Sequence, residues 1–384
     1  MHGHDLNLRH LRAIVAIYRH GTISAAAREV NLTQPAITQG VAGIERQLGA
    51  ALFERSSGGM SPTAAAHVLV PRIATALDRI ASARVTAAQM RAFLALARAG
   101  SYAAAACDVG TSEPSLHRAV RDLSLGLGRE LVERRGRGIA LTARGLRLAR
   151  AFALARADIE AGIEEVAALA GRETGRISIG AMPLCRARLL PDAIARFHAS
   201  YPNYRIVVAE GSHAELVGPL RDGELDLLIG ALRDPSPGAD LEQRALFEDR
   251  PVVVARAGHP LAGTDPSIEA LAAYPWSIAP PGAPLRGHWE AMFAGGGMAP
   301  PAVPVECGSV IAIRQLMMSS DFLTLLSPDQ VAVELEAGWL TILCPARPEI
   351  VRTIGITTRA DWHPTPLQQR FLAELGLTND LRKN

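Results

Sequence analysis

The stretch from Gly21 to Arg55, GTISAAAREVNLTQPAITQGVAGIERQLGAALFER, decides the fold of the first part of this chain. A second version of it, GSYAAAACDVGTSEPSLHRAVRDLSLGLGRELVER, runs from Gly100 to Arg134. The longer blocks 11–66 and 90–145 align without a gap at a constant offset of 79 residues, and about a third of the positions are identical. Agreement of this extent is improbable by chance, so the chain contains a small domain written twice.

Within one copy, signals for short helices follow each other closely. Apolar residues at helical spacing before Gly21 predict a first helix that ends at this glycine. Thr22 is placed to cap a second, alanine-rich helix, and Thr33 to cap a third helix with Pro35 in its first turn. The sequence LFER, which begins at Leu52, then leads into SSGGM and predicts a two-stranded wing. This succession is typical of a winged helix-turn-helix.

In that motif the third helix enters the major groove of DNA, and the residues at its start meet base edges. Gln pairs with adenine through two hydrogen bonds, Thr bonds to either kind of base, and Ala and the Thr methyl suit thymine. A similar outline also occurs in helical cores that bind nothing, but the wing, the cap-plus-proline start and the repetition favour DNA binding. The candidate DNA-contacting residues of the first copy are Thr33, Gln34, Pro35, Ala36, Thr38, Gln39 and the wing residue Arg55.

The second copy differs from the first at the positions that should contact base edges. Glu113, His117 and Arg118 replace the glutamine, threonine and glutamine of the first copy. Phosphates repel a carboxylate, although Glu can accept a hydrogen bond from cytosine. The second wing is more basic, which predicts binding to the DNA backbone with little reading of sequence; the alternative is a structural remnant that packs or dimerises. The candidate DNA contacts of this copy are His117, Arg118, Arg134 and Arg135, with Arg137 beside them.

The segments Gly21–Ala27, Thr33–Thr38 and Ile44–Gly49 closely resemble the winged helix-turn-helix of LysR-type transcriptional regulators. Gly223–Gly230 and Gly258–Ala262 resemble the effector domain of the same family. The resemblance implies a sequence-specific regulator that binds promoter or operator DNA and a small-molecule effector, associates with itself as a dimer or tetramer, and has RNA polymerase as a partner. The departure is the second winged unit, because ordinary members have one unit, a linker helix and the effector domain.

Charge is spread unevenly along the chain. Residues 1–145 hold 18 arginines and 10 acidic residues, an excess of eight positive charges. Since the whole chain has a net charge of +2, the remainder carries six negative charges in excess. Arginine-rich composition alone would not decide the function, but a basic region that coincides with the helix-turn-helix units suits a DNA-binding head on an acidic body.

Several classes of protein are disfavoured. The chain shows neither a signal-peptide core nor an apolar run of about 18 residues, which predicts a cytoplasmic protein without membrane contact. We expect no enzyme, catalytic residue, cofactor or metal, because no nucleophile elbow, P-loop or zinc-protease motif occurs. A solute-binding module whose winged units serve only protein interaction or oligomerisation remains the alternative. The cysteines fit a reducing compartment, as incidental thiols rather than a peroxide-sensing pair, and are Cys107, Cys185, Cys307 and Cys344.

Residues 142–170 contain no proline and carry apolar residues at steps of three and four, which predicts one long helix with an apolar seam. The seam could pack on its own domain or pair two chains, and the family resemblance favours the pairing. A shorter helix, about residues 63–83, joins the two winged units. The seam residues are Leu148, Phe152, Ala155, Ile159, Ile163, Val166 and Leu169.

After residue 176, short apolar strands alternate with helices, which predicts a parallel α/β sheet. The resemblance implies two lobes like those of periplasmic binding proteins, with the ligand bound between them at helix N-termini and strand ends. Ser309 could hold an anionic or hydroxyl-rich ligand, and Arg233 or Arg286 could neutralise a carboxylate. The candidate effector-binding residues are Pro183, Leu184, Cys185, Leu232, Arg233, Pro281, Gly282, Gly308, Ser309 and Ser327.

The predicted fold class is therefore multidomain: two tandem all-α winged helix-turn-helix units, a long linker helix, and a two-lobed α/β effector domain like a periplasmic binding protein. The predicted parts are a first unit at 6–66, a connecting helix at 67–86, a second unit at 87–145, a linker helix at 142–172 and an effector domain at 174–376, with lobe I at about 174–250 and 352–376 and lobe II at about 251–347.

Overall fold

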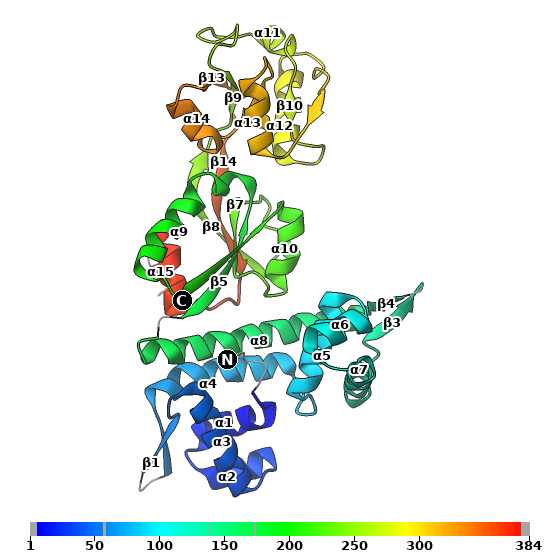
Figure 1. The fold of residues 1–384 in the computed structure, drawn as a ribbon, viewed down its shortest axis with the longest axis vertical. Coiled ribbons are helices and arrows are strands. Elements are labelled where there is room, and N and C mark those ends of the chain that lie inside the picture. The colour runs from blue at the N-terminus through cyan, green and yellow to red at the C-terminus, as the bar shows by residue number, and fades with distance from the viewer. Residues whose placement is uncertain (1–5, 57–58, 137, 173, 378–384) are drawn as a thin grey trace.

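The computed structural model describes residues 6–56, 59–136, 138–172 and 174–377 (Figure 1). Both copies of the repeat form three helices followed by an antiparallel hairpin. The first unit consists of α1 (Leu8–His20), α2 (Ile23–Val30), α3 (Gln34–Leu48), β1 (Phe53–Ser56) and β2 (Gly59–Pro62). The second consists of α5 (Ala87–Ala99), α6 (Tyr102–Val109), α7 (Glu113–Leu127), β3 (Val132–Arg135) and β4 (Gly138–Leu141).

The predicted helix ends are confirmed. Gly21 closes α1 with φ 70°, in the left-handed region that favours glycine, and its N–H donates to the carbonyl of Ile17. The hydroxyls of Thr22 and Thr33 accept hydrogen bonds from the third residue after each of them, at the starts of α2 and α3. Ser101 and Ser112 do the same in the second unit. The caps therefore set the same sharp turns in both copies.

Each unit leads into a linker helix, α4 (Ala64–Ile80) and α8 (Ala143–Leu169), and these two helices pack against each other. They run antiparallel, because Arg72 pairs with Glu165 whereas Arg79, further along α4, pairs with Asp158, earlier in α8. Figure 1 shows α8 between α4 and the effector domain. Most of the apolar seam is thus covered within the single chain, whereas Leu169 at its end is exposed, and pairing of two chains through this helix stays a prediction.

Lobe I is built on a five-stranded sheet in the order β6-β5-β7-β14-β8. Strands β5 (Gly175–Ala181), β6 (Tyr204–Glu210) and β7 (Leu227–Ala231) are parallel, as predicted. Strands β8 (Leu241–Asp249) and β14 (Arg352–Arg359) were not predicted as strands, and β14 runs antiparallel to both its neighbours. The sheet is therefore mixed rather than parallel. The helices of this lobe are η2 (Pro183–Arg186), α9 (Leu189–Ser200), α10 (His213–Arg221) and α15 (Pro366–Glu374).

Lobe II has an antiparallel sheet in the order β12-β9-β13 and a separate parallel pair, β10 with β11. Its core gathers three buried aromatic rings, Trp276, Trp289 and Phe293, in edge-to-face contacts. The strands are β9 (Val252–Arg256), β10 (Ser277–Ile278), β11 (Val305–Glu306), β12 (Thr324–Leu326) and β13 (Leu340–Pro345). The helices are α11 (Ile268–Ala272), α12 (Pro284–Gly295), α13 (Val310–Met318), η3 (Pro328–Val331) and α14 (Ala332–Glu336).

The described residues contain neither a candidate membrane span nor a candidate metal cluster. Among them, no helix is long and apolar enough to cross a membrane. Nor does this part of the chain group three or more His, Cys, Asp or Glu side chains that could hold a metal ion.

Candidate DNA interface and effector cleft

Helix α3 presents a polar face to solvent and an apolar face to the core of the first unit. Ile37, Val41 and Ile44 are buried and hold the helix in place. The predicted contact residues Thr33, Gln34, Pro35, Thr38 and Gln39 are exposed, and Ala36 is half-buried. The Thr38 hydroxyl donates to the carbonyl of Gln34 at 3.0 Å. Its methyl group and its oxygen lone pairs are therefore what Thr38 can offer to a base.

The first wing is anchored to the turn between α1 and α2. The Met60 N–H donates to the carbonyl of Gly21 at 2.7 Å. A side chain at Gly59, where φ is 133°, would place its Cβ 2.3 Å from that carbonyl oxygen. Only glycine allows so close an approach. Arg55, on β1, is exposed on this anchored hairpin, as a phosphate contact requires.

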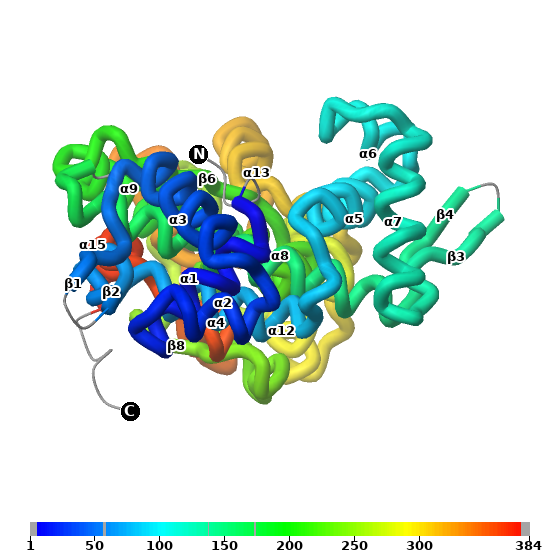
Figure 2. The backbone as a smooth tube through the Cα atoms, turned by 90° about the horizontal axis from the view of Figure 1, so that it is seen from below, coloured from blue at the N-terminus to red at the C-terminus, as the bar shows by residue number. Residues whose placement is uncertain are grey.

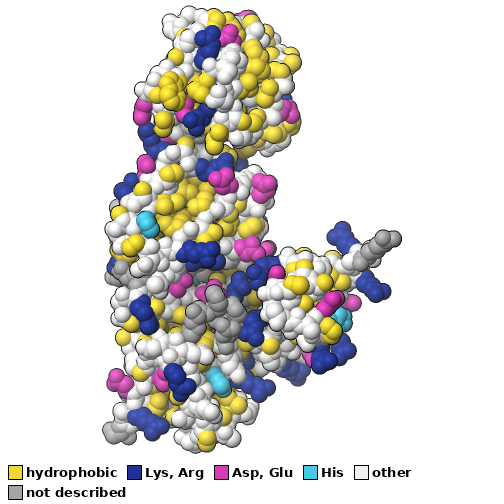
Figure 3. Space-filling view, viewed as in Figure 1, with side chains coloured by type: hydrophobic (Ala, Val, Ile, Leu, Met, Phe, Trp, Pro, Cys, Tyr) yellow, Lys and Arg dark blue, Asp and Glu magenta, His cyan; other side chains and the backbone are white. Residues whose placement is uncertain are grey.

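The second unit exposes a more basic surface. His117 and Arg118 lie exposed on α7, and the His117 ring packs against Tyr102 of α6 with 4.8 Å between ring centroids. Arg134 and Arg135 are exposed on β3, while Arg137 lies outside the described residues. Figure 3 shows basic side chains gathered over this unit and its wing, all of them arginines because the unit contains no lysine. The structure thus presents a cationic surface here, with a ring held beside it by a second aromatic residue.

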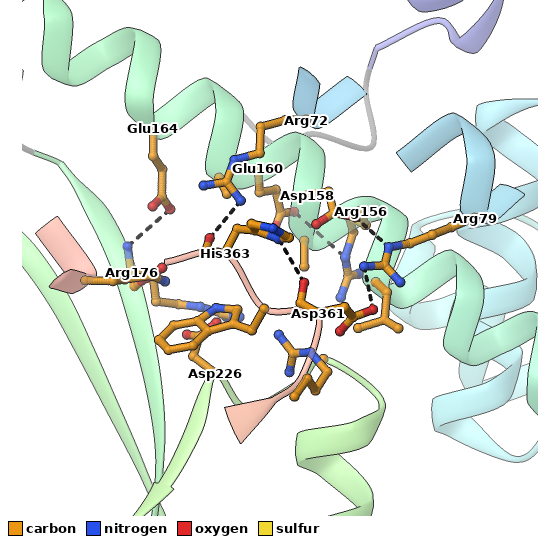
Figure 4. Close-up of a pocket in the computed structure, with 17 residues that line it drawn as sticks. Arg72, Arg79, Arg156, Asp158, Glu160, Glu164, Arg176, Asp226, Asp361 and His363 are labelled. Atoms are coloured by element: carbon orange, nitrogen blue, oxygen red, sulfur yellow. Dashed lines mark hydrogen bonds and ion pairs between the residues drawn. The ribbon is translucent and has the colours of Figure 1, made fainter. Parts of the chain in front are cut away.

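The head, defined as residues 6–172, joins lobe I through a polar interface between α4, α8 and the loop after β14 (Figure 4). Arg79 of α4 binds Asp158 of α8 at 2.7 Å and Asp361 of lobe I at 2.9 Å. Arg72 binds Glu165 at 2.6 Å and donates to the carbonyl of His363 at 2.7 Å. Two arginines of the linker helix α4 therefore tie α8 and the effector domain together. Sequence spacing gave no sign of these long-range pairs.

Glu164 and Asp226 are carboxyl groups at this interface whose pKa values are raised because burial penalises their charged forms. Desolvation raises the pKa of Glu164 to about 8, although its carboxylate accepts a hydrogen bond from the Arg176 N–H. Desolvation likewise raises the pKa of Asp226 to about 6, against the hydrogen bond it accepts from the Ser178 N–H. Both groups line a cavity of about 60 Å³ between α8 and lobe I.

Three of the predicted effector residues are buried in this structure. Cys185 belongs to the core of lobe I, where its thiol lies 3.2 Å from the carbonyl of Met182, and burial raises its pKa to about 12. Leu184 is buried beside it. Ser327 is 1 % exposed, and its hydroxyl caps η3. These three side chains thus have little surface free for a ligand, and their role as ligand contacts stays a prediction.

The two arginines proposed to neutralise a ligand carboxylate, Arg233 and Arg286, lie in different surroundings. Arg286 pairs with Glu290 and Glu306 at 2.7 and 3.0 Å and lies over the Trp289 ring, so two carboxylates already neutralise it. Arg233 is half-buried, and its backbone is clamped by Gln243 through two hydrogen bonds of 2.8 Å. Arg233, which has no carboxylate partner among the ion pairs of the described residues, is thus better placed than Arg286 to bind a carboxylate.

The remaining predicted residues lie at strand ends and helix starts, as the pattern indicated. Ser309 caps α13 and is exposed, with Gly308 beside it. Pro281 and Gly282 form the exposed turn before α12, and Gly282 has φ 87°. Pro183 begins η2, and Leu232 follows β7. Each lobe thus contributes part of the predicted set.

The lobes themselves meet at η2, which contains three of the predicted residues, and at the strands where the chain crosses between lobes. Helix η2 of lobe I contacts η3 of lobe II, and Arg188 reaches Glu336 at 2.5 Å across the same junction. Where the chain crosses between lobes, Arg352 forms an ion pair with Asp249, and both side chains are largely buried. Each of these ion pairs joins two single charged residues that are far apart in the sequence, so the sequence offered no signal for the pairs.

Comparison with known proteins matches the two parts of this architecture. The family model described as "LysR substrate binding domain" matches residues 170–377. The model described as "Bacterial regulatory helix-turn-helix protein, lysR family" matches twice, at residues 8–67 and 87–146. The repeat derived from the sequence therefore corresponds to two separate matches of one DNA-binding domain.

Among curated relatives, the HTH-type transcriptional regulator GalR of Pseudomonas putida is 30% identical over 380 residues, which cover 96% of each chain. The SDS degradation transcriptional activation protein of a Pseudomonas species is 34% identical over 261 residues, 66% of this chain and 83% of the relative. These relatives are transcriptional regulators, not enzymes.

Solved structures share the fold. Full-length OxyR from Pseudomonas aeruginosa superposes with a TM-score of 0.56 at 24% identity, over 76% of this chain and 95% of that one. LysG from Corynebacterium glutamicum, determined with a bound effector Arg, superposes with a TM-score of 0.53 at 21% identity, over 75% and 95%. The reading of the chain as a solute-binding module is not favoured. This chain belongs to the LysR family and is a DNA-binding transcriptional regulator with a C-terminal substrate-binding domain.

Proposed function

We propose that the first winged unit reads the base sequence of the operator through Gln34, Thr38 and Gln39, and that Arg55 contacts phosphate. The observation that carries this proposal is the exposed polar face of α3 on a helix fixed by a buried apolar face. Gln34 and Gln39 can each bond twice to adenine, and the Thr38 methyl suits thymine. The proposed half-site of this unit is therefore rich in A·T pairs.

The test uses a duplex that the full chain selects from a random-sequence pool. Replacing Gln34 with Ala should weaken binding to that duplex by about 1–3 kcal/mol and relax the preference at one base pair. Gln47→Ala is the matched control, because Gln47 is an exposed glutamine at the far end of the same helix. Equal behaviour of the two variants would refute the assignment.

We also propose that the small-molecule effector binds between the two lobes, near Ser309, Gly308 and Arg233. The exposed start of α13 supports this, because free N–H groups at a helix start attract anions and hydroxyl groups. The chemistry fits a small carboxylate or a polyol. We further propose that the protein acts in the cytoplasm, with RNA polymerase as its partner at the promoter, as its membership of a family of transcriptional regulators supports.

The effector proposal can be tested with a panel of small carboxylic acids and polyols in a thermal-shift assay. A compound that raises the melting temperature of the wild type should lose this effect in Ser309→Ala. Ser267→Ala is the matched control, because Ser267 caps α11 of the same lobe with a hydrogen bond of similar length. A shift that survives Ser309→Ala and Arg233→Ala places the ligand elsewhere.

A further inference from the structure

The two linker helices cross at residues that correspond in the two copies of the repeat. Arg79 and Asp158 differ by the repeat offset of 79 residues, and their side chains bind each other at 2.7 Å. The corresponding pairs Ala76 with Ala155 and Ile80 with Ile159 are all buried in the same core. In an antiparallel pair, corresponding residues meet only at a two-fold axis. The head therefore has an internal pseudo-two-fold axis at this crossing.

Contacts away from the axis are reciprocal, as such an axis requires. The segment after α4 lies against the end of α7, where Arg84 donates to the carbonyl of Gly126 at 3.3 Å. The corresponding positions in the other copy are Ile163 on α8 and Gln47 at the end of α3, and these two residues line one crevice. Helix α3 of the first unit thus contacts α8, and the second unit contacts the segment that follows α4, at corresponding positions of the repeat.

The axis places the two units at opposite ends of the helix pair. Tyr18 of the first unit bonds to His67 near the start of α4, and Phe93 of the second unit packs on Phe152 in the first half of α8. Figures 1 and 2 show the two units well apart. α4 has 17 residues and is therefore about 25 Å long. This length is of the order of one DNA turn, roughly 34 Å, which separates half-sites in two-fold DNA readers.

We propose that a single chain forms a complete two-headed DNA reader, which binds an operator made of two unlike half-sites. The inference rests on the proposed function of the first unit and adds a second reading head, in place of the mainly backbone binding that the basic second wing predicts. Glu113 suits the cytosine amino group and Arg118 suits guanine, so the half-site of the second unit is weighted to G·C pairs. Contact of His117 with Tyr102 fixes a further donor on that helix. The operator is therefore asymmetric, with A·T-rich and G·C-rich halves.

The first test asks whether the linker helices pair within one chain. Arg79→Asp and Asp158→Arg each place like charges at the crossing, and each should lower affinity for the selected duplex roughly tenfold. The double variant restores opposite charges within one chain and should recover most of the affinity. Asp361 lies close enough to Asp158 to interact with an arginine there as well. Circular dichroism of each variant reports whether the helices remain folded.

A mixture of the two single variants distinguishes pairing of α4 with α8 within one chain from pairing between two chains. If α4 pairs with α8 of the same chain, no molecule in the mixture holds an opposite pair, and affinity stays low. If α4 pairs with α8 of another chain, mixed dimers hold two opposite pairs, and affinity recovers. Recovery in the mixture, or failure of the double variant to recover, overturns the inference.

The second test maps each head on the selected duplex by footprinting. Gln34→Ala should weaken protection of one half only, and Arg118→Ala of the other half only, each with an affinity loss of about 5- to 150-fold. Arg205→Ala, exposed on β6 of the effector domain, is the control. If Gln34→Ala has no effect, the proposed function of the first unit fails. If Gln34→Ala acts but Arg118→Ala does not, or if each variant alters both halves, the two-headed reader fails.

Discussion

Gln34 and Glu113 occupy corresponding positions in two units that share their caps, their buried face and their wing. The same kind of cap and the same buried apolar face hold both helices, so the exchange of Gln34 for Glu113 changes which base is recognised and leaves the fold unchanged. A neutral amide offers both a donor and an acceptor, whereas a carboxylate only accepts. A single side chain thus decides which base each helix can address.

At the same scale, Arg55 and Gln34 should behave differently although both belong to the first unit. Arg55→Ala removes a cation from an exposed wing, and we expect it to weaken binding to every DNA sequence alike. The slope of log affinity against log salt should fall by about 0.9 for each phosphate that the wing no longer neutralises. Titrations at several salt concentrations, with selected and random duplexes, measure this. A weakening confined to the selected duplex would contradict a phosphate role.

Glu164 should make the free energy of unfolding depend on pH. Its pKa is about 8 in the folded chain against an ordinary value of 4.5, so the folded state keeps a proton that the unfolded state has released. The free energy of unfolding should therefore fall as pH rises from about 4.5 to 8, by at most about 1.4 kcal/mol per pH unit from this group.

Glu164→Gln should remove that part of the pH dependence and make the protein more stable than the wild type near pH 8. Urea unfolding at pH 5, 6, 7 and 8 measures the effect. Glu54→Gln, in the exposed first wing, provides the control for loss of one negative charge. Parallel curves for wild type and Glu164→Gln would show that the carboxyl group is solvated.

At the scale of elements, α4 and α8 form one packed unit rather than two connectors. A Cβ at Gly162 would lie 2.8 Å from the Leu69 side chain and 3.0 Å from the Arg72 Cβ, so the helices approach closely here. Ile159 of α8 is wholly buried within the chain. A charge at Ile159 is thus expected to destabilise the head itself, rather than to separate two chains.

Gly162→Ala tests the closeness of this packing. The methyl group should cost about 1–3 kcal/mol through overpacking, despite the better helix propensity of alanine. Gly43→Ala is the matched control, because Gly43 lies in α3 with open space around it. That change should stabilise by about 0.5–1 kcal/mol. Thermal unfolding followed by circular dichroism compares the two, and equal shifts would contradict close packing.

The elements also show what the sequence could predict. Local signals set the caps, the helices of both units and the alternating strands of lobe I, because each depends on a few neighbouring residues. Strands β8 and β14 were not predicted. β8 lacks a continuous apolar pattern because it is mostly polar and partly exposed along its length. The apolar seam of α8 was visible, but its partner was not, because pairing depends on residues about 80 positions away.

The candidate sites divide in the same way. The exposed polar residues of α3 follow directly from helix periodicity and capping. The interior placement of Cys185, and the ion pairs that occupy Arg286, depend on how distant elements pack. Helix starts in lobe II could be located from sequence, whereas which side chains remain free at them could not.

At the scale of the whole molecule, Arg72 and Arg79 connect head and body. Asp361→Asn removes one charged partner of Arg79 and leaves its pair with Asp158 intact. We expect faster hydrogen exchange in residues 359–364 and in the face of α8 beside them, with affinity for the selected duplex changed less than about twofold. Unchanged exchange would show that Arg79 does not hold the interface. Asp265→Asn, which removes the exposed ion pair with Arg347 within lobe II and touches no part of the head, is the control.

The crossing of α4 and α8 has a consequence for mass action. Two heads on separate chains part on dilution, and the fraction of paired heads then depends on protein concentration. Two heads on one chain are held at a fixed effective concentration by the segment that joins them, however few molecules are present. Pairing of the heads in this regulator should therefore be insensitive to its own abundance, and only assembly of whole chains should respond to it.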